Sequence, residues 1–214
     1  SVDSITTIFE NDTYNFAGRA PIILHFHFDN QLFNVINVHL KCCGDGILDT
    51  TNSSDEENRR FNALNMLKSY IDQNFSSNNV LLIGDFNDEL TDINSNNIFN
   101  QFFNDSINYK FADYDIALGP PYNWSYPNWP SHIDHVLISN EIFDKNFNVS
   151  TIPVDNYFLG GFPQYDAVIS DHLPVGISIE FSVSTTGCLD SLASNYDSSA
   201  LFDDGSCTYT SLEL

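Results

Sequence analysis

Basic residues are scarce in this chain. Only 7 of its 214 residues are Lys or Arg, against 29 Asp or Glu, which gives a formal net charge of −22. A protein that binds nucleic acid through a broad basic face needs the opposite balance, so that class of binder is excluded. Binding of a phosphate ester through metal ions stays compatible with this charge, because a bound cation inverts the local field.

Two further absences narrow the class of protein. The sequence contains no run of 18 apolar residues, so we expect no transmembrane helix. It contains no Cys-x-x-Cys spacing, which argues against a structural zinc site. Hydrophobic residues make up 42% of the chain and aromatic residues 14%. This composition and length can supply one sizeable domain, alone or with a small appendage.

The four cysteines fall into two pairs. Cys188 and Cys207 flank a loop rich in Asp, Ser and Asn, which predicts a disulfide formed in an oxidising compartment and therefore favours a secreted protein. Cys42 and Cys43 are adjacent in the sequence. They could pair with each other in a strained ring, pair outside the chain or stay as free thiols, and the sequence leaves these alternatives open.

A short apolar run that ends in polar residues is the centre of the predicted fold. Residues 80–83 form a continuous apolar segment, which is typical of a strand buried on both faces. Gly84 ends it, and Asp85 and Asn87 follow. In extended geometry these two side chains point the same way and present oxygen atoms to a cation or a water. The alternative is a polar turn that only closes the strand.

Strands and one long helix are expected around this segment. Before the helix we expect an edge strand and an antiparallel hairpin, at residues 4–9, 22–28 and 32–40. Ser54 and Glu57 form a capping-box pattern, and an apolar stripe at helical spacing predicts a helix from Asp55. The remaining expected elements are a short helix and four strands, at residues 94–103, 109–117, 131–139, 147–154 and 175–181. This order predicts a layered α/β fold.

Polar side chains recur where the predicted strands begin or end: His39, Asp85, Asn87, Asp134, Asp171 and His172. Each of them alone is explained by an ordinary turn or cap. Their recurrence is what metal-assisted phosphoryl chemistry requires, because carboxylates bind a cation and orient water while imidazoles move protons or stabilise charge. On the strand at 131–139, we expect His132 and Asp134 to share a face.

Four short segments carry a family resemblance: Asn-Val-His-Leu at 37–40, Gly-Asp-Phe-Asn at 84–87, Ile-Asp-His-Val at 133–136 and Ser-Asp-His-Leu-Pro-Val at 170–175. Their order and context resemble the endonuclease/exonuclease/phosphatase superfamily, which includes deoxyribonuclease I and the abasic-site exonucleases. The resemblance covers about residues 19–181. It implies a four-layered α/β sandwich, with two packed, mainly antiparallel sheets flanked by helices, and divalent-metal-dependent cleavage of phosphodiesters.

The resemblance also implies roles for single residues. His39 and His172 correspond to the paired catalytic histidines, and Asp134 corresponds to a carboxylate that supports a histidine. Asp85 and Asn87 correspond to groups that orient the attacking water and bind the phosphate or a metal ion.

Further binding residues follow from the resemblance and from one loop. Asp171 corresponds to a metal ligand, and the implied cofactor is Mg²⁺, with Mn²⁺ or Ca²⁺ as alternatives. Arg19, in an Arg-x-Pro pattern, resembles a phosphate-contacting arginine. Trp124 and Trp129 lie in an aromatic loop at 122–129. Their rings are candidate substrate-binding groups that could stack on bases or enter a membrane interface, and packing over the sheet edge is an equally open alternative.

The sequence departs from the family pattern at its beginning. Family members carry a strand-borne Asn and a metal-binding Glu in their N-terminal part, and no counterpart is found here. Glu10 lies in a segment that does not match that motif. We therefore expect a chain that begins after the motif, with an incomplete metal site, a sheet short of strands, and little or no activity as a fragment.

Three segments are predicted along the chain. They are a catalytic domain over residues 1–181, a linker at 182–186 and a small, acidic, disulfide-stapled module at 187–214. The last resembles short Cys-bounded repeats in secreted bacterial proteins. Its aspartates could form a calcium loop, although a solvated spacer is the simpler interpretation.

The leading functional hypothesis is a secreted, metal-dependent DNA or RNA endonuclease that acts as a monomer on nucleic acid or another phosphodiester. One alternative is a phosphoesterase for lipid head groups or inositol phosphates. The other is a non-catalytic remnant or binding module, which the missing glutamate motivates.

Overall fold

The chain divides into two compact units, Ser1–Ile179 and Glu180–Leu214. The computed structural model describes residues 1–181 and 186–209, so the predicted linker lies outside the described residues except for Thr186. Among the residues described, no helix has both the length and the apolar character needed to cross a membrane.

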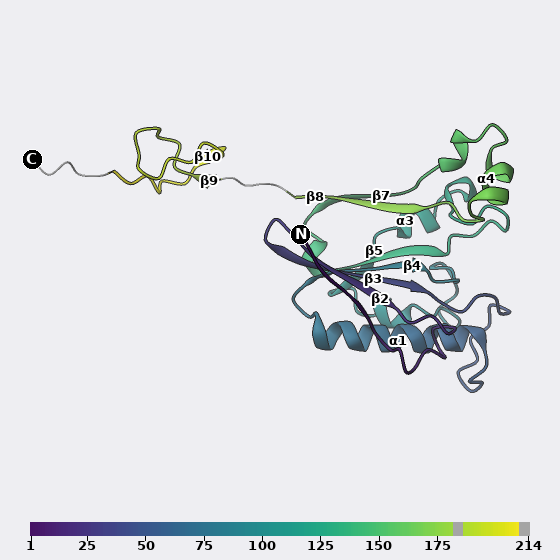
Figure 1. The fold of residues 1–214 in the computed structure, drawn as a ribbon. Helices are drawn as coiled ribbons and strands as arrows, with labels where there is room; N and C mark the ends of the chain where they lie inside the picture. The colour runs from purple at the N-terminus through teal and green to yellow at the C-terminus, as the bar shows by residue number, and fades with distance from the viewer. Residues whose placement is uncertain (182–185, 210–214) are drawn as a thin grey trace, which may run out of the picture. The chain divides into compact units, whose positions relative to one another are not determined.

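A six-stranded sheet with the order β1-β2-β3-β4-β6-β5 forms the centre of the first unit (Figure 1). Its strands are β1 (Val2–Thr7), β2 (Ile22–Phe28), β3 (Gln31–His39), β4 (Asn79–Asp85), β5 (Tyr109–Phe111) and β6 (Asp134–Ser139). Strands β3 and β4 are parallel, and the other neighbours are antiparallel. The predicted β2–β3 hairpin and the edge position of β1 are thus confirmed.

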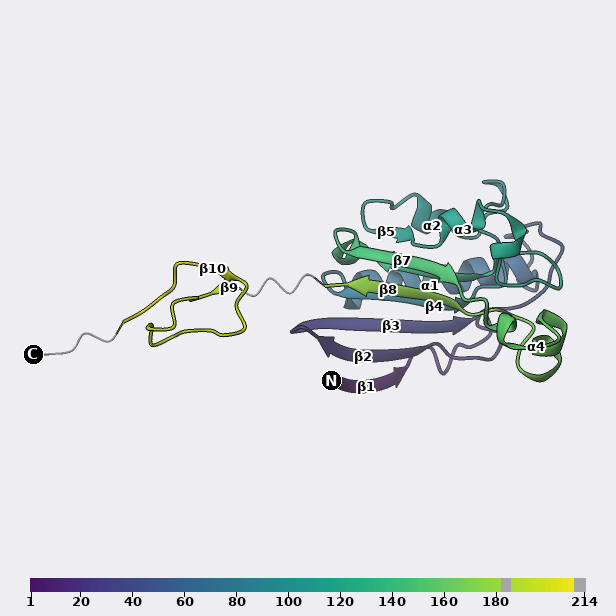
Figure 2. The same cartoon turned by 90° about the horizontal axis from the view of Figure 1, so that it is seen from above.

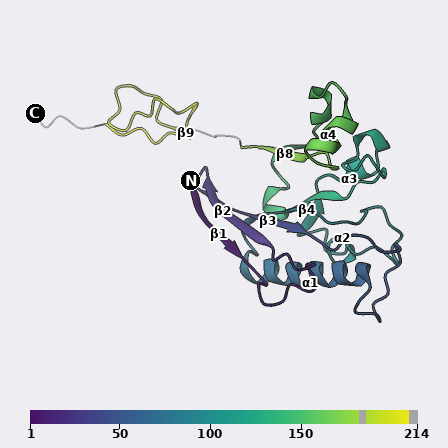
Figure 3. The ribbon, with the colours of Figure 1, turned by 45° about the vertical axis from the view of Figure 1, so that its right-hand side comes forward.

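A smaller sheet lies over one face of the central sheet. It consists of β7 (Asn146–Thr151) and β8 (Val175–Glu180), which pair with each other. Figure 2 shows this sheet from above, and its two strands run in opposite directions. Helix α1 (Glu56–Asn74) lies against the opposite face (Figure 3). Two sheets with flanking helices confirm the predicted α/β class. The last residues of β3 and β4 and the first residue of β6 lie side by side at one end of the central sheet.

Helix α1 begins one residue later than the capping-box pattern predicts. The carboxylate of Asp55 accepts a hydrogen bond of 2.7 Å from the backbone N–H of Asn58, so Asp55 is the N-cap in place of Ser54. The predicted apolar stripe is confirmed, since Leu64, Leu67 and Ile71 are buried in the core and the partly buried Phe61 packs against it. This burial, more than intrinsic propensity, stabilises the helix.

Shorter elements differ from the sequence-based expectation. The strand expected over 109–117 ends at Phe111, and α3 (Tyr114–Ala117) follows it. The helix expected over 94–103 is limited to α2 (Asn100–Phe103). The remaining short helices of the first unit are η1 (Pro121–Asn123), η2 (Asn140–Ile142), η3 (Val154–Tyr157) and α4 (Phe162–Val168).

The second unit is small and disulfide-bonded. Strands β9 (Thr186–Gly187) and β10 (Phe202–Asp203) pair in parallel, and Cys188 is bonded to Cys207. The disulfide predicted from the sequence is therefore confirmed. The unit has few buried apolar residues, so the disulfide replaces part of the core that so short a segment cannot form.

Gly84 is required by the close approach of β3 and β4. It lies opposite Val38 in the parallel register, with φ at +132°. A Cβ atom at this position would lie 1.9 Å from the carbonyl oxygen of Val38. Only glycine avoids both the backbone strain and the clash, and the two strands then end side by side with His39 opposite Asp85.

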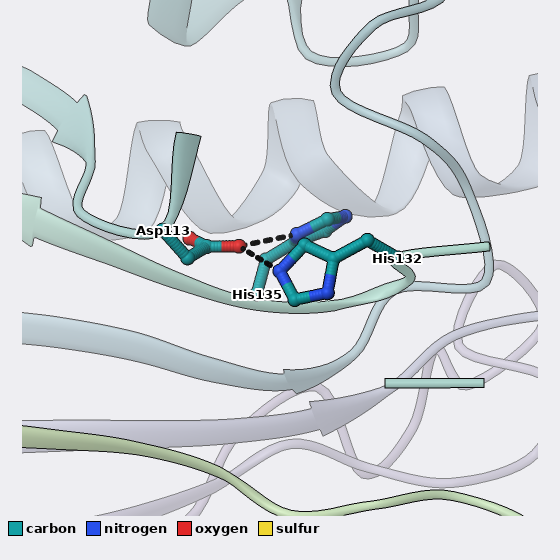
Figure 4. A group of neighbouring side chains, drawn as sticks. All are labelled: Asp113, His132 and His135. Atoms are coloured by element: carbon teal, nitrogen blue, oxygen red, sulfur yellow. Dashed lines mark hydrogen bonds and ion pairs between the residues drawn. The ribbon is translucent and has the colours of Figure 1, made fainter. Parts of the chain in front are cut away.

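A buried charged cluster joins β5 to β6 (Figure 4). The carboxylate of Asp113, fully buried, accepts hydrogen bonds from His132 Nε2 (3.0 Å), His135 Nδ1 (2.7 Å) and the backbone N–H of Val136 (2.9 Å). His132 precedes β6, so the expectation that it shares a strand face with Asp134 is wrong. The chain turns inward at His132 because the buried carboxylate needs donors.

The contacts of His135 in this cluster favour its positively charged form. Its Nδ1–H donates to Asp113 and its Nε2–H donates to the carbonyl oxygen of Asp88 at 2.9 Å. Burial alone would lower the pKa of His135, but the negative charge of Asp113 and the hydrogen bonds to Asp113 and to the carbonyl oxygen of Asp88 together raise it. Burial would likewise raise the pKa of Asp113, but the charge of His135 and the hydrogen bond from His132 hold it far below its usual range.

The first prediction concerns the approach of β3 and β4. Gly84→Ala should lower the free energy of unfolding by about 3 kcal/mol or more, since backbone strain and overpacking add. Gly18→Ala is the matched control: Gly18 also has positive φ, but nothing lies within 4 Å of the added Cβ, so its cost should be about 1 kcal/mol. Urea unfolding of both variants measures this, and equal costs would contradict the role given to Gly84.

The second prediction concerns pH. The pKa of Asp113 is lowered in the fold, so its charge stabilises the folded state at pH values above its unfolded pKa of 3.8. The pKa of His135 is raised, so its contribution to the free energy of unfolding is complete at pH values below its unfolded pKa of 6.5. The free energy of unfolding should therefore decrease as pH rises beyond 6.5 and protons leave His135. His135→Gln should cost about 3 kcal/mol or more at pH 6 and reduce this slope. His27→Gln, at the exposed His27–Asp3 pair, should leave the slope unchanged; a reduction there instead would refute the assignment to His135.

Candidate active site

Three neighbouring strands place one polar side chain each in a row at the open edge of the sheet. Asp85 of β4 lies directly opposite His39 of β3 and directly opposite Asp134 of β6. The Nε2 atom of His39 lies 3.4 Å from Oδ2 of Asp85. The row follows from the strand register, so its spacing is fixed by backbone hydrogen bonds and not by flexible loops.

His172 extends the row by one residue. It lies in the loop that precedes β8, and its Nδ1–H donates to Oδ2 of Asp134 at 2.7 Å. The ring of Tyr126 lies against it, with centroids 4.8 Å apart, and the Tyr165 hydroxyl donates to its backbone carbonyl at 3.2 Å. Asp134 and Tyr126 thus hold the ring, Tyr165 holds the backbone of His172, and the row has the order His39, Asp85, Asp134, His172.

The two carboxylates in the row influence the charge of their neighbours. The side chain of Asp85 is 15% exposed, and burial, followed by the negative charge of Asp134, raises its pKa. The hydrogen bond to Asp134 raises the pKa of His172 against the opposing effect of burial. The row therefore combines a carboxylate that gains from a nearby cation with an imidazole that tends to stay protonated.

A cleft of about 610 Å³ opens over this row. Its lining contains His39, Cys42, Cys43, Asp85, Asn87, Tyr126, Ile133, Asp134, Ser170, Asp171 and His172. Six of the residues predicted from the sequence are therefore brought together here. Asn87 adopts a left-handed backbone with φ at +55°, its N–H donates to Oδ1 of Asp85 at 2.8 Å, and its side-chain amide donates to the carbonyl oxygen of Leu40 at 3.3 Å.

Asp85, Asp134 and His172 can hold a metal ion, because one ligand atom from each lies within 4.8 Å of the others. The two carboxylates, Asp85 and Asp134, fit a divalent cation. Asp85 is mostly buried and has no Lys or Arg partner among the described residues, so a bound cation would offset its charge. Asp171 is exposed in the same cleft but does not belong to this group. Its role as a ligand stays a prediction.

Three predicted substrate-binding residues lie outside the lining of the cleft. Arg19 donates from Nε to the carbonyl oxygen of His39 (3.0 Å) and from an Nη atom to that of Leu40 (2.7 Å), so it supports the end of β3. The indole N–H of Trp124 donates to the carbonyl oxygen of Ile116 at 3.0 Å. Trp129 is 78% exposed. These contacts assign a structural task to Arg19 and Trp124, and their roles toward substrate stay predictions.

Other residues of the cleft were not selected from the sequence. Cys42 and Cys43 are exposed free thiols with sulfur atoms 3.1 Å apart, and the aromatic loop contributes Tyr126 rather than its tryptophans. The many aromatic residues of the loop at 122–129 indicated from the sequence that the loop could contribute to a binding site. The choice of Tyr126 depends on the position of His172, which comes from a distant part of the chain.

A buried arginine supports the cleft wall that contains the two cysteines. Arg60 of α1 donates to the carbonyl oxygens of Lys41 (2.8 Å) and Cys43 (2.7 Å) and to the carboxylate of Asp88 (2.9 Å). Burial raises the pKa of Asp88 to about 7 although Arg60 opposes this rise. The capping residues around α1 were visible in the sequence, but the tertiary partners of Arg60 were not.

Comparisons with known proteins agree with this geometry. The model of the endonuclease/exonuclease/phosphatase family matches residues 4–172, whereas none of the curated proteins matches significantly. The fold resembles D. rerio TDP2 complexed with single-strand DNA product (TM-score 0.59, 12% identity), with coverage of 85% of this chain and 68% of that chain.

Two more solved structures share the fold. Truncated Caenorhabditis elegans TDP2 has a TM-score of 0.51 and 14% identity, with coverage of 85% of this chain and 66% of that chain. The human Nocturnin catalytic domain with bound sulfate anion has a TM-score of 0.52 and 16% identity, with coverage of 84% and 60%. At superfamily level this is the fold of a phosphodiester hydrolase. Because the family model matches most of the sequence, the chain belongs to the endonuclease/exonuclease/phosphatase family.

Proposed function

We propose that this chain is a metal-dependent phosphodiesterase that cleaves nucleic acid and acts outside the cell. The row His39, Asp85, Asp134 and His172 at the floor of one cleft carries the proposal. Family membership supports phosphodiester hydrolysis. The DNA product in D. rerio TDP2 supports nucleic acid as the substrate class, and the disulfide between Cys188 and Cys207 supports secretion.

The cation would be held by Asp85 and Asn87. Of the other two groups close to Asp85, Asp134 would bond to His172 and His172 would keep its proton, so neither would serve as a ligand. When bound, Mg²⁺ would offset phosphate charge and lower the pKa of a bound water. Asp85 is already fixed for this task, because the backbone N–H of Asn87 holds its Oδ1 atom. With a net charge of −22, the protein repels a polyanion at long range, so local cation binding is the means by which a phosphodiester can approach the cleft.

His172 would act on the phosphate as a protonated imidazole. Asp134 accepts the Nδ1–H, which fixes the ring and leaves Nε2 without a protein partner among the described residues. The raised pKa favours the charged form. A charged Nε2–H can donate to a phosphate oxygen or to the leaving oxygen and stabilise the charge that develops in the transition state.

His39 would serve at the other end of the row. Its side chain is 51% exposed and its Nε2 atom lies 3.4 Å from Asp85, so the ring can exchange a proton with solvent while Asp85 orients it. The two imidazoles therefore occupy opposite ends of the carboxylate pair. This arrangement provides one proton donor and one acceptor without requiring either ring to move.

The third prediction tests the two histidines. In the full-length enzyme, His172→Ala and His39→Ala should each lower turnover by about 10²–10⁴-fold without lowering the melting temperature. Nicking of supercoiled plasmid with Mg²⁺, with and without a chelator, measures this. His27→Ala, on β2 and outside the cleft, is the control and should keep full activity. Near wild-type nicking by both cleft variants would remove them from the mechanism.

The fourth prediction concerns Asp134 as a positioning residue. Asp134→Asn should lower kcat by about 10–100-fold with little change in KM, because the ring of His172 loses the carboxylate that orients it and raises its pKa. The double variant with His172→Ala should be no slower than His172→Ala alone, since both changes affect one function. Fully additive losses in this cycle would show that Asp134 acts independently of His172.

A lipid head group is the second candidate substrate. Large apolar side chains on the loops near the aromatic segment and around η3 are highly exposed: Tyr122, Trp129, Tyr157 and Leu159. Such side chains can enter a membrane interface. Release of head groups from phospholipid vesicles, measured beside plasmid and RNA cleavage, distinguishes the two. Vesicle hydrolysis without nucleic-acid cleavage would replace the first candidate while keeping the same catalytic row.

A further inference from the structure

We propose that residues 44–57, outside the cleft, form a second cation site that binds Ca²⁺ through Asp45, Asp55 and Glu57. One ligand atom from each of these carboxylates lies within 4.8 Å of the other two. The segment connects the cleft wall at Cys43 to the first turn of α1. The proposal does not depend on the function assigned to the cleft, because none of the three residues lines it.

Each carboxylate is fixed through one oxygen. Oδ1 of Asp45 accepts from the N–H of Ile47 (3.0 Å). Oδ1 of Asp55 accepts from the N–H of Asn58 (2.7 Å) and from the backbone N–H of Asp49 (3.4 Å). Oε1 of Glu57 accepts from the N–H of Gly46 at 2.8 Å. These bonds set the directions of the three groups while each second oxygen has no hydrogen-bond donor within the described part of the chain.

Glu57 supplies the observation that points to a ligand. The residue is 2% exposed, and its buried Oε2 atom has no hydrogen-bond partner among the described residues. A buried carboxylate oxygen without a partner is costly. Arg60 lies 3.1 Å from Oε1, the other oxygen, and also pairs with Asp88. One guanidinium therefore pairs with two carboxylates, those of Glu57 and Asp88, and leaves Oε2 of Glu57 without a donor among the described residues.

The backbone of the loop at Gly44 lies close to the carboxylate of Glu57. A Cβ atom at Gly44 would lie 2.1 Å from Oε1 and 2.6 Å from Oε2 of Glu57, so both oxygens face the turn that carries Asp45. Gly44 has φ at +114°, which brings the backbone close to the carboxylate. Asp45 is exposed and Asp55 is half-buried, so the group lies between the buried Glu57 and the surface.

The donor set selects a hard cation. All three groups are carboxylates, without sulfur or imidazole, which excludes a preference for zinc or copper. Ca²⁺ accepts six to eight oxygen ligands in flexible geometry, including carbonyl oxygens and water. Mg²⁺ requires near-ideal octahedral geometry, for which a surface loop that offers carboxylates from both sides of a turn is less suitable. We therefore assign Ca²⁺ to this site and Mg²⁺ to the cleft.

A bound Ca²⁺ would join the cleft wall to the helix. Arg60 connects Glu57 with the carbonyl oxygens of Lys41 and Cys43, so an ion on Glu57 strengthens a network that ends at the cleft. Because the ion binds only the folded chain, it should raise the melting temperature in proportion to the logarithm of its concentration.

Asp45→Asn is the test variant. Asp55 caps α1 and Glu57 pairs with Arg60, so changing either would disturb the fold, whereas Asp45 is exposed and bonds only Ile47 within the described residues. Asp49→Asn is the matched control: Asp49 lies on the same loop and also accepts a backbone N–H two residues on, but it is not one of the three ligands. Both variants are made in the full chain with Asp85→Asn, which weakens cation binding in the cleft.

Thermal unfolding and calorimetric titration with Ca²⁺ and with Mg²⁺ provide the readouts. In the Asp85→Asn background, saturating Ca²⁺ should raise the melting temperature by about 5 °C, with one bound ion and a smaller response to Mg²⁺. Asp45→Asn should weaken Ca²⁺ binding at least about tenfold, and Asp49→Asn should not. An unchanged Ca²⁺ affinity in Asp45→Asn overturns the proposal, as does the absence of any Ca²⁺ response in the background protein, which would assign water to Glu57. Neither result bears on nuclease activity.

Discussion

The close parallel pairing of β3 with β4 is the constraint on which the site depends. The carbonyl oxygen of Val38 occupies the space that a side chain at Gly84 would need. With glycine at this position, the strands remain in register to their last residues, and His39 comes to lie beside Asp85. The antiparallel partner β6 then adds Asp134 on the other side. A row of functional groups follows from backbone geometry alone.

Because positively charged residues are scarce, only some of the buried carboxylates pair with a cationic side chain. Inside the fold, the few cationic groups are used on buried carboxylates: Arg60 faces Glu57 and Asp88, and the charged His135 faces Asp113. Among the described residues, no Lys or Arg pairs with Asp85, and Oε2 of Glu57 has no hydrogen-bond partner. Further carboxylates lie close to both groups. Such positions are favourable for metal ions, because uncompensated buried charge is costly.

The His172–Asp134 pair and the His135–Asp113 pair differ in what the second ring nitrogen of the histidine contacts. His172 uses one ring nitrogen on Asp134 and keeps the other for the cleft, whereas both nitrogens of His135 are committed to acceptors in the core. The same residue types therefore stabilise the core in one place, and in the other they carry the proposed chemistry of the cleft. His135 follows Asp134 directly in β6, and strand alternation sends the neighbours to opposite faces.

Local pattern was sufficient for much of the fold and part of the site. The apolar run at 80–83 identified a buried strand, and short motifs placed His39, Asp85, Asn87, Asp134 and His172 at strand ends, because each adjoins its strand along the chain. The inward turn of His132 toward Asp113, the support of Lys41 and Cys43 by Arg60, and the contact of Tyr126 with His172 were decided only by tertiary structure. These pairs join segments far apart in the sequence, so their partners are selected by burial and strand register, which no local periodicity records.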